Sequence, residues 1–572
     1  MKASRKDLES RVTFVLAVVL LGFVGVLVRA FWLQILPDQK LKLLARRQFE
    51  SRIQVQNRRA NILDRDSKPL IVSTRAYSFF MDPKKIENPK LFSKKVGKLL
   101  SMDSKKLYKK IMEFRQRRFV WLKRHLPENE AKLIISKKLD SLYFVEEFKR
   151  EPIRGRLASH VLGFTSRDGR GLEGVERYFD KYLDRDPHVL TIEKDALGRS
   201  IYRQLNHFKE PDQEIVDLKL SIDSSLQYFV EKSLEATIEK FKARGGTVIV
   251  MDPYSGEIYA LANYPDFDLS SPNQYPATFR RNRAVTDPIE PGSVLKPFLV
   301  AESIEKSLVN EDTWIATPGG KVKVADRWIH EADKEHEKSG YKVKDLIKHS
   351  SNVATVNLLQ KVGSATLYSA YKKVGFGELT GVEIPGESRG IVRWPGAKQI
   401  VEQATWSFGQ GIAVTPLQII RAYAALANGG FKVKPHLVGS RISRDGRVQS
   451  EVNNNSVGER IFSKKTTARM TKLLESVVEE EGTGTLARLE HFKVAGKTGT
   501  SQKPAVGSSG YQKGSYIASF VGYFPSEAPR FVVYVNVDEP QKIYYGGLVA
   551  GPLFSEIARQ AMRMNPLSSI AR

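Results

Sequence analysis

The most regular hydrophobic pattern of the chain lies between residues 216 and 262. Apolar side chains recur there at every fourth position, at Leu226, Val230, Leu234 and Ile238. This spacing predicts an amphipathic helix, and Gly245–Gly246 is expected to end it. Apolar runs at 247–251 and 257–262 follow, separated by the turn-like sequence Asp252–Gly256. The helix is therefore predicted to lead into a β-hairpin, which is typical of an α+β domain.

Two further apolar runs lie near the C-terminus, at 516–524 and 531–537, with a polar turn between them. They predict another pair of strands, and residues 553–564 predict a final helix. A sheet built from the first and last of these segments, with helices between them, accounts for 216–564 as one α+β domain. The remaining residues, 565–572, are expected to form a short C-terminal tail.

The N-terminal region contains a long apolar segment. No charged residue interrupts Val12–Val28, and after one arginine the apolar sequence continues to Leu36. With Trp32 as an interfacial anchor, 12–36 is long enough to span a bilayer as an uncleaved signal anchor, which leaves 1–11 as a cytoplasmic tail. Lysine and arginine residues stand on both sides of this span, so the positive-inside rule does not decide its orientation.

The region between the span and residue 216 is rich in lysine and arginine and mixes short strand and helix patterns. Residues 103–118 predict a basic helix, and 171–178 begin another helical stretch. The region shows no grouping of side chains that would indicate catalysis. We interpret 37–215 as a non-catalytic spacer or docking module.

Composition narrows the classes of function. The 572 residues include no cysteine, which excludes disulfides, thiol nucleophiles and cysteine metal sites. The formal net charge of +27 is compatible with nucleic acid, an anionic membrane surface or an anionic polymer as a partner. The basic residues are scattered, however, and no usual nucleic-acid-binding motif is present. We therefore expect a generally basic, solvated surface and no nucleic-acid partner.

Candidate chemistry begins with Ser293 and Lys296, which form an S-x-x-K pattern within Glu290–Phe298. A serine hydroxyl needs an adjacent base to become a nucleophile, and positions i and i+3 of a helix share one face. If Ser293 opens a helix, Lys296 lies beside its hydroxyl, and the free N–H groups of the helix start can stabilise an oxyanion. The same pattern occurs in a loop-like context and in two helix-like contexts, at Ser339 and Lys342, Ser303 and Lys306, and Ser369 and Lys372.

Two more short patterns follow in the same domain. Ser350–Asn352 is an S-x-N pattern, and Lys497–Thr500 has the sequence K-T-G-T. Each has an ordinary alternative, because Ser350 fits a helix cap and Lys497–Thr500 fits a strand end with a turn. A second S-x-N, at Ser271–Asn273, precedes Ser293 and contains a proline typical of a turn. The three patterns in this order within one domain are far more specific than any one of them.

The motifs S-x-x-K, S-D-N and K-T-G together are the signature of penicillin-binding proteins and class A β-lactamases, and here Ser351 replaces the aspartate. From the apolar span almost to the C-terminus, the chain resembles the class B penicillin-binding proteins. Further segments that are similar to this family are Arg58–Arg65, Gly171, Gly174, Glu176, 408–418 and 424–430. Within the first of them, Ala60 stands where the family usually has glycine. Asn352 and Tyr544–Gly547 most resemble the septal, cell-division branch.

The resemblance implies a fold and a location. A single transmembrane helix is expected to carry an elongated pedestal (dimerisation-like) domain at 37–215. The domain at 216–564 is then expected to have the penicillin-binding, serine-transpeptidase fold, an antiparallel sheet with flanking helices. The bulk of the chain is expected outside the cytoplasm, on a single-pass anchor in the cytoplasmic (inner) membrane.

The resemblance also implies a role for each motif residue in a peptidoglycan D,D-transpeptidase. Ser293 is expected to attack the D-alanyl-D-alanine end of a stem peptide, with Lys296 as base and Ser350 as proton relay. Burial and the neighbouring charge of Lys497 are expected to lower the pKa of Lys296. The N–H groups of Ser293 and Thr500 are the expected oxyanion hole. The residues expected to bind substrate are Asn352, Lys497, Thr498, Gly499 and Thr500.

Partners and alternatives follow from the same resemblance. The expected partners are peptidoglycan stem peptides, β-lactam antibiotics, the membrane, a polytopic glycosyltransferase and other division proteins, and neither a metal nor a cofactor is expected. An elongation-type transpeptidase remains open, as does a β-lactam-binding sensor or scaffold with little turnover. A hydrolytic relative, either a β-lactamase or a carboxypeptidase, shares the three motifs, but the chain has no E-x-x-L-N sequence of the class A β-lactamase kind.

Overall fold

The computed structural model describes residues 2–35, 50–55, 58–184, 188–194, 200–201, 216–332, 338–443, 448–451, 457–505, 507 and 510–564. The chain divides into two compact units. Unit 1 consists of Met1–Asn57, Arg75–Phe148 and Asp186–Glu210, and unit 2 consists of Arg58–Thr74, Lys149–Arg185 and Pro211–Arg572. Leu36, the expected end of the span, and the expected tail 565–572 lie outside the described residues.

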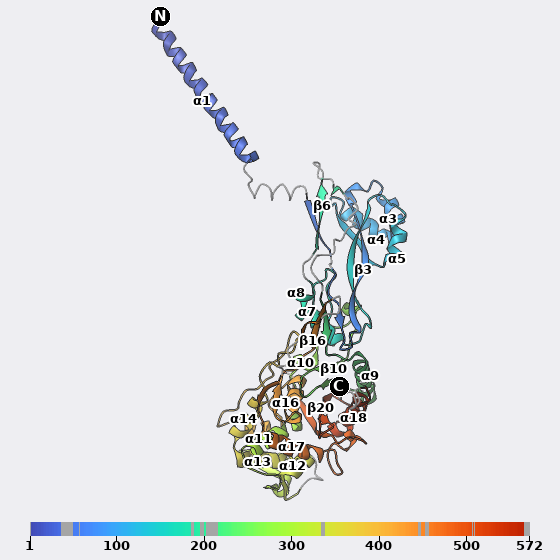
Figure 1. Cartoon of the computed structure of the whole chain (residues 1–572), viewed down its shortest axis with the longest axis vertical. Helices are drawn as coiled ribbons and strands as arrows, with labels where there is room; N and C mark the ends of the chain where they lie inside the picture. Colours follow the sequence, from blue (N-terminus) through green and yellow to red (C-terminus); the bar gives the residue numbers. More distant parts are fainter. Residues whose placement is uncertain are drawn as a thin grey trace. The chain divides into compact units, whose positions relative to one another are not determined.

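Unit 1 begins with α1 (Lys2–Ile35), a single continuous helix (Figure 1). Its segment Asp7–Trp32 has a mean hydropathy of 2.6, and the described chain does not bury it. By length and composition, this helix is able to cross a membrane. Unit 1 also contains a small antiparallel sheet, whose strands are β1 (Glu50–Val55), β6 (His188–Lys194) and β7 (Ser200–Ile201).

The rest of unit 1 packs helices around a compact apolar core that includes Phe79, Val96 and Ile111. Strand β4 (Val120–Leu126) pairs antiparallel with residues 77–81. The other elements here are η1 (Pro83–Lys85), α3 (Pro89–Leu99), α4 (Ser104–Glu113) and α5 (Glu128–Ile135). Strands β3 (Pro69–Met81) and β5 (Leu142–Pro152) each contribute residues to both units.

The basic helix predicted at 103–118 is shorter in the structure. Helix α4 begins after Asp103, whose side chain caps it by accepting a hydrogen bond from the backbone N–H of Lys106. The helix ends at Glu113, before the predicted end. The Arg115 guanidinium then donates hydrogen bonds to the backbone carbonyls of η1 and the residue after it, at 2.8 and 2.6 Å. These contacts replace a further helical turn.

Unit 2 contains a mixed sheet with the strand order β17-β16-β8-β2-β3. Within it, β2 and β8 run parallel, with Ile62 opposite Leu218. The strands not yet introduced are β2 (Ile62–Leu63), β8 (Val216–Leu220), β16 (Val438–Ser443) and β17 (Val448–Glu451). Short helices follow β5 in the same unit, namely α6 (Ser159–Leu162), α7 (Gly174–Tyr178) and α8 (Asp180–Leu183).

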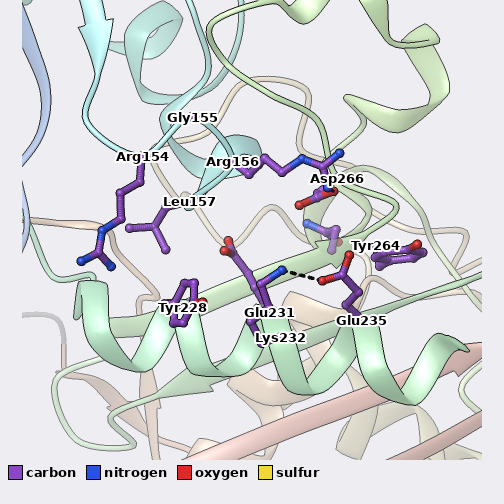
Figure 2. A pocket seen from close by; sticks show the side chains of 11 residues that line it. Arg154, Gly155, Arg156, Leu157, Tyr228, Glu231, Lys232, Glu235, Tyr264 and Asp266 are labelled. Carbon is purple, nitrogen blue, oxygen red and sulfur yellow. Dashed lines mark hydrogen bonds and ion pairs between the residues drawn. The ribbon is translucent and has the colours of Figure 1, made fainter. Parts of the chain in front are cut away.

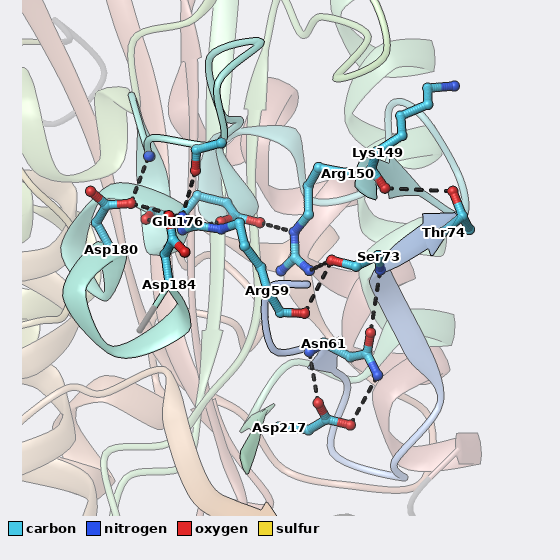
Figure 3. A network of polar contacts seen from close by, with 12 residues as sticks. Arg59, Asn61, Ser73, Thr74, Lys149, Arg150, Glu176, Asp180, Asp184 and Asp217 are labelled. Atoms are coloured by element: carbon cyan, nitrogen blue, oxygen red, sulfur yellow. Dashed lines mark hydrogen bonds and ion pairs between the residues drawn. The ribbon is translucent and has the colours of Figure 1, made fainter. Parts of the chain in front are cut away.

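Two distant sequence segments meet in unit 2 through a buried ionic network (Figure 3). The Arg59 guanidinium lies 2.9 Å from the Glu176 carboxylate, and neither side chain is exposed. Arg150 Nε lies 2.6 Å from the same carboxylate, and Asp180 lies 3.0 Å from Arg59. Because a buried charge is costly without a partner, this network joins the segment Arg58–Arg65 to the segment that begins at Gly171.

The centre of unit 2 is a five-stranded antiparallel sheet with the order β10-β9-β21-β20-β19. Its strands are β9 (Gly245–Met251), β10 (Ile258–Tyr264), β19 (Ala495–Pro504), β20 (Tyr511–Phe524) and β21 (Phe531–Asp538). The sequence predicted that the first and last segments of this region share a sheet, and they do. Strand β19, which carries K-T-G-T, lies at one edge.

Both faces of this sheet are buried. Val248 and Val250 of β9 face one core, together with α9 (Ser224–Phe241) and α18 (Gly546–Met564). Ile249 and Met251 face the opposite core, because successive side chains of a strand alternate between faces. Helices α9 and α18 pack against each other as well as against the sheet (Figure 1).

The opposite core contains most of the remaining helices of unit 2. The helices are α10 (Arg283–Thr286), α11 (Lys296–Glu305), α12 (Val343–His349), α13 (Asn352–Val362), α14 (Ser364–Lys373), α15 (Ile400–Trp406), α16 (Pro416–Ala427) and α17 (Lys464–Glu475). The short 3-10 helices of unit 2 are η2 (Pro272–Gln274), η3 (Ala277–Phe279), η4 (Gly292–Leu295), η5 (Pro318–Gly320) and η7 (Thr485–Ala487). Short strand pairs complete it, formed by β11 (Trp314–Ala316), β12 (Lys321–Val324), β13 (Arg327–His330), β14 (Gly340–Lys342), β15 (Phe431–Val433) and β18 (Val457–Arg460).

The prediction that Gly245–Gly246 ends the amphipathic helix is wrong. Helix α9 ends at Phe241, and Lys242 after it adopts the left-handed conformation, with φ of 47°. The two glycines lie inside β9 instead. They serve close strand packing, since a Cβ at Gly246 would lie 2.7 Å from the Asn536 carbonyl oxygen.

The final helix begins earlier than predicted. Helix α18 starts at Gly546, whereas the sequence indicated a start at residue 553. Glycines usually favour a loop, but here they let the helix start approach β19, because a Cβ at Gly546 would lie 2.2 Å from the Gly499 carbonyl oxygen.

Candidate active site

Ser293 lies in a tight turn at the start of a buried helix. It belongs to η4, and α11 begins at Lys296, so a 3-10 helix stands where an α-helix start was expected. Gly292 before it has φ of +61° and donates its N–H to the Gly409 carbonyl at 3.0 Å. A Cβ at Gly292 would lie 3.2 Å from the Thr500 carbonyl oxygen. The turn that carries the serine is therefore packed closely against β19.

Lys296 connects the first motif to the second. Its side chain is fully buried, and Nζ donates hydrogen bonds to the backbone carbonyl of Ser350 at 2.5 Å and to Asn352 Oδ1 at 2.7 Å. A longer contact of 3.3 Å reaches Ser350 Oγ. In the described part of the chain, the Ser293 hydroxyl itself makes no hydrogen bond. The structure thus brings Lys296, Ser350 and Asn352 together and leaves the half-buried serine hydroxyl available.

Lys497 connects the third motif to the second. Its Nζ donates to Ser350 Oγ at 2.8 Å and to the Thr498 carbonyl at 3.2 Å. The Ser350 hydroxyl therefore lies between the amines of Lys296 and Lys497, which is the position that a proton relay requires.

The two threonines of K-T-G-T are fixed by neighbours. Thr498 Oγ1 shares a hydrogen bond of 2.8 Å with Thr483 Oγ1. Thr500 Oγ1 accepts a hydrogen bond of 3.0 Å from the N–H of Gly546, at the start of α18. Because that contact uses only a lone pair of Thr500, its hydroxyl proton remains able to bind an anion.

Gly499 allows β19 to approach the Ser293 turn. A Cβ at this position would lie 2.9 Å from Val294 Cγ1 and 3.0 Å from the Pro291 carbonyl oxygen. It would also lie 2.4 Å from the Ser519 hydroxyl. Any larger residue here forces the edge strand away from the serine.

Burial controls the charges of the two lysines. Removal from water lowers the pKa of Lys296 to about 7, and the carboxylate of Glu331 acts in the opposite direction. Burial and the charge of Lys296 together place the pKa of Lys497 well below its ordinary value. The sequence anticipated a lowered pKa for Lys296 through burial and like charge; burial lowers it, whereas the effect of like charge falls on the pKa of Lys497.

Glu331 also belongs to this region, although it is part of none of the three motifs. It follows β13, and its carboxylate accepts hydrogen bonds from Ser351 Oγ at 2.5 Å and from the backbone N–H of Asn352 at 2.8 Å. Its local sequence resembles an ordinary charged loop, so no motif indicates it. The left-handed conformation of Ser350, with φ of 59°, was equally invisible in the sequence.

The other S-x-x-K serines have structural roles or lie elsewhere. Ser303 Oγ donates to the Leu299 carbonyl inside α11, and Ser369 Oγ donates to Glu302 Oε1. Ser339 lies in a bend just before β14. Among the described residues, no group of three histidine, aspartate or glutamate side chains is placed to hold a metal ion.

A separate cavity of about 240 Å³ lies beside α9 (Figure 2). Glu231 of α9 is fixed there by hydrogen bonds from the N–H of Ala158 and from Gln227, and burial raises the pKa of this carboxyl to about 8. None of the residues of the three motifs lines this cavity.

Two protein-family models match the chain. The penicillin-binding protein transpeptidase domain matches residues 246–559, and the penicillin-binding protein dimerisation domain matches residues 54–216. The first match contains all three motifs.

Individual relatives match almost the whole chain. The probable peptidoglycan D,D-transpeptidase PenA of Neisseria meningitidis is 32% identical, with 96% of this chain and 92% of that protein covered. The peptidoglycan D,D-transpeptidase FtsI of Escherichia coli is 31% identical, with 95% of this chain and 90% of that protein covered. The crystal structure of penicillin-binding protein 3 from Mycobacterium tuberculosis, in complex with aztreonam, matches with a TM-score of 0.67 and 25% identity, covering 90% of this chain and 98% of that one.

Proposed function

The chain belongs to the penicillin-binding protein transpeptidases, and from this membership we propose that it is a peptidoglycan D,D-transpeptidase that cross-links stem peptides during septal cell-wall synthesis. The observation that carries the proposal is the convergence of Lys296, Ser350 and Lys497 at the turn that presents Ser293. A nucleophile, a buried amine with a lowered pKa and a bridging hydroxyl are the parts that acyl transfer by a serine requires.

Acylation begins when Ser293 Oγ attacks the carbonyl carbon of the penultimate D-alanine. The hydroxyl proton passes to the neutral amine of Lys296, whose pKa of about 7 leaves this amine substantially unprotonated at neutral pH. The backbone N–H groups of Ser293 and Thr500 receive the negative charge that develops on the carbonyl oxygen. The carbon–nitrogen bond then breaks as Ser350 passes its hydroxyl proton to the departing amine and takes the proton held by Lys296 in its place, and D-alanine leaves.

Transfer reverses these steps with a different amine. An amine of a neighbouring stem peptide attacks the ester carbon, the bond to Ser293 Oγ breaks, and the proton of the amine returns to the serine through Ser350 and Lys296. Overall, one amide bond is broken and another is formed, so the reaction needs no further reactant. A β-lactam places its ring amide where the scissile amide lies, and acylates the same serine.

Substrate binding is assigned to the edge strand and to Asn352. Lys497 supplies an amine whose protonated form the terminal carboxylate of the stem peptide favours, and Thr498 and Thr500 supply hydroxyls for the same carboxylate. Gly499 keeps this strand close enough to Ser293 for both to contact one substrate. Asn352, which accepts from Lys296 through Oδ1, offers its amide nitrogen to the peptide backbone of the substrate.

Labelling with a fluorescent penicillin tests this function. The full-length protein should be labelled covalently, and Ser293→Ala should abolish the label. Ser339→Ala is the matched control, because it removes another S-x-x-K serine and should label normally. Retained labelling of Ser293→Ala, or an adduct on a different serine by mass spectrometry, contradicts the assignment.

The proposal includes a location and a domain arrangement. We assign 12–36 to a single membrane span, 37–215 to a pedestal domain and 216–564 to an extracytoplasmic transpeptidase domain. The length and apolar composition of α1 support the span, and the two family matches support the order of the domains.

A transpeptidase forms cross-links but no glycan strands, so another protein must supply nascent glycan near Ser293. We assign this role to a polytopic glycosyltransferase of the division machinery, bound through the span at 12–36 and the segment Arg58–Arg65. Replacing the span by an unrelated one should weaken co-purification with the polymerase while penicillin labelling continues, and so should a separate reversal of charge at Arg58 and Arg65. Unchanged co-purification contradicts the contact through the span.

A further inference from the structure

The second motif is held by a contact from a different part of the sequence. Glu331, at the end of the β12–β13 hairpin, accepts one hydrogen bond from Ser351 Oγ and one from the N–H of Asn352. Ser351 Oγ also accepts a hydrogen bond of 2.9 Å from the N–H of Ala354, and so caps α13. Ser351 thus donates its hydroxyl proton to Glu331 and accepts the N–H at the start of α13 with a lone pair. Ser351 and the N–H of Asn352 are therefore both held by defined partners.

The geometry of the catalytic groups depends on this junction. Ser350 links the end of α12 to α13 in the left-handed conformation, which is costly for a residue other than glycine and persists only where surrounding contacts enforce it. The two groups that accept from Lys296 Nζ at the shortest distances, the Ser350 carbonyl and Asn352 Oδ1, stand on either side of Ser351. A shift of this turn would therefore move both of them relative to the buried amine.

The charge of Glu331 is also relevant to the two lysines. Lys296 and Lys497 are both fully buried, and the charge of Lys296 disfavours protonation of Lys497. The ionisable groups that face Lys296 are Lys497 from β19 and Glu331 from the hairpin. Glu331 is thus the carboxylate that favours the protonated form of Lys296 after it takes the serine proton.

We propose that Glu331 is a positioning residue of this active site, which holds the Ser351–Asn352 turn and so directs Ser350 and Asn352 at Lys296. The inference rests on the proposed transpeptidase function, because it assigns Lys296 the role of base. Glu331 does not touch the substrate in this proposal. Its effect on acylation passes through the turn and through the charge of Lys296.

The pH profile of acylation tests the proposal. Full-length protein in detergent is reacted with a fluorescent penicillin from about pH 5 to about pH 9, a range that extends roughly two units to either side of neutral pH. The second-order rate constant of acylation is measured for each variant. Glu331→Gln keeps the size of the side chain and removes its charge. The maximum rate should fall by about 10- to 100-fold, since a misplacement of a catalytic group by about 1 Å lowers the rate by about 100-fold and the loss of one contact moves the turn by less. The acidic limb of the profile should move to lower pH, because loss of the carboxylate lowers the pKa of Lys296 further.

Two other variants separate positioning from general stability. Glu331→Asp keeps the charge, so its acidic limb should stay where it is in the wild type while its maximum rate is intermediate. Asp326→Asn is the matched control, because it makes the same change of charge at an exposed residue of the same hairpin, and both its rate and its limb should be unchanged.

The outcomes distinguish this proposal from the proposed function. If wild-type protein is not labelled on Ser293, the transpeptidase assignment fails, and the positioning role fails with it. If the wild type is labelled and Glu331→Gln gives the wild-type rate and limb, only the positioning role is overturned. A Glu331→Gln variant with a lower melting temperature but an unchanged profile also overturns it, because a merely structural contact would behave in that way.

Discussion

Gly499 provides a sharp test of how the edge strand and the nucleophile are placed. In Gly499→Ala, the added methyl would lie 2.9 Å from Val294 Cγ1, whereas ordinary contacts begin at 3.4 Å. The difference, 3.4 − 2.9 = 0.5 Å, is the least separation that β19 and the Ser293 turn must undergo. Val294 is β-branched and fully buried, and the next obstacle is a backbone carbonyl, so neither moves easily.

This displacement acts on the oxyanion hole. One of its proposed donors, the N–H of Ser293, belongs to the turn, and the other, the N–H of Thr500, belongs to β19, so the two donors would move apart. A misplacement of about 1 Å lowers catalysis by about 100-fold, so we expect penicillin acylation of Gly499→Ala to fall by about 10- to 100-fold. Overpacking of the same site should lower the free energy of unfolding by about 1–3 kcal/mol. Acylation is measured by stopped-flow fluorescence and stability by thermal unfolding.

Gly439→Ala is the control for this experiment. Gly439 lies in β16, and a Cβ there would lie 3.8 Å from the nearest atom, the Lys219 carbonyl oxygen. This variant should acylate and unfold like the wild type. A Gly499→Ala protein that acylates at the wild-type rate would refute the argument, even if its melting temperature falls.

Three further predictions concern other parts of the chain. The rate of penicillin acylation should fall about tenfold for each pH unit below about 7, because Lys296 becomes protonated. Lys296→Arg should lower this rate by about 100- to 10,000-fold at every pH, because arginine stays charged. Glu176→Gln should lower the free energy of unfolding by about 3–5 kcal/mol in chemical denaturation, because it leaves the buried Arg59 and Arg150 without their shared carboxylate, while the partly exposed Glu173→Gln should have little effect. A chain that starts after residue 36 should be soluble and labelled by penicillin yet unable to support growth in a depletion strain, and full complementation by it would remove the need for the anchor.

Short-range patterns predicted the parts of the fold that local physics controls. The spacing of Leu226 and Val230 identified α9, and the turn sequence Asp252–Gly256 identified the β9–β10 hairpin. The end of α9 was predicted wrongly because glycine has two uses. A glycine permits a left-handed helix end, but it also permits close approach of two backbones, and Gly246 does the second. Which of these two uses applies to Gly246 depends on the position of β21, and the sequence around Gly246 carries no information about that position.

The predicted site residues came from motif order, and their geometry came from long-range packing. The sequence placed Lys296 one turn after Ser293, whereas the contacts that fix its amine come from Ser350 and Asn352. Glu331 could not be predicted, because its partners lie on a different element and a lone glutamate in a charged loop carries no motif. The division of the chain into units was equally hidden, since the parallel pairing of β2 with β8 joins distant residues.

Transfer of an acyl group from Ser293 to an amine can be followed by mass spectrometry of a peptide reaction. Full-length protein is incubated with a stem peptide that ends in D-alanyl-D-alanine and with an acceptor amine. We expect an intermediate ester on Ser293, D-alanine and an amide-linked product released in equal amounts, and loss of all three in Ser293→Ala. Release of D-alanine with only the hydrolysed peptide as product, or a product that survives Ser293→Ala, would contradict this expectation.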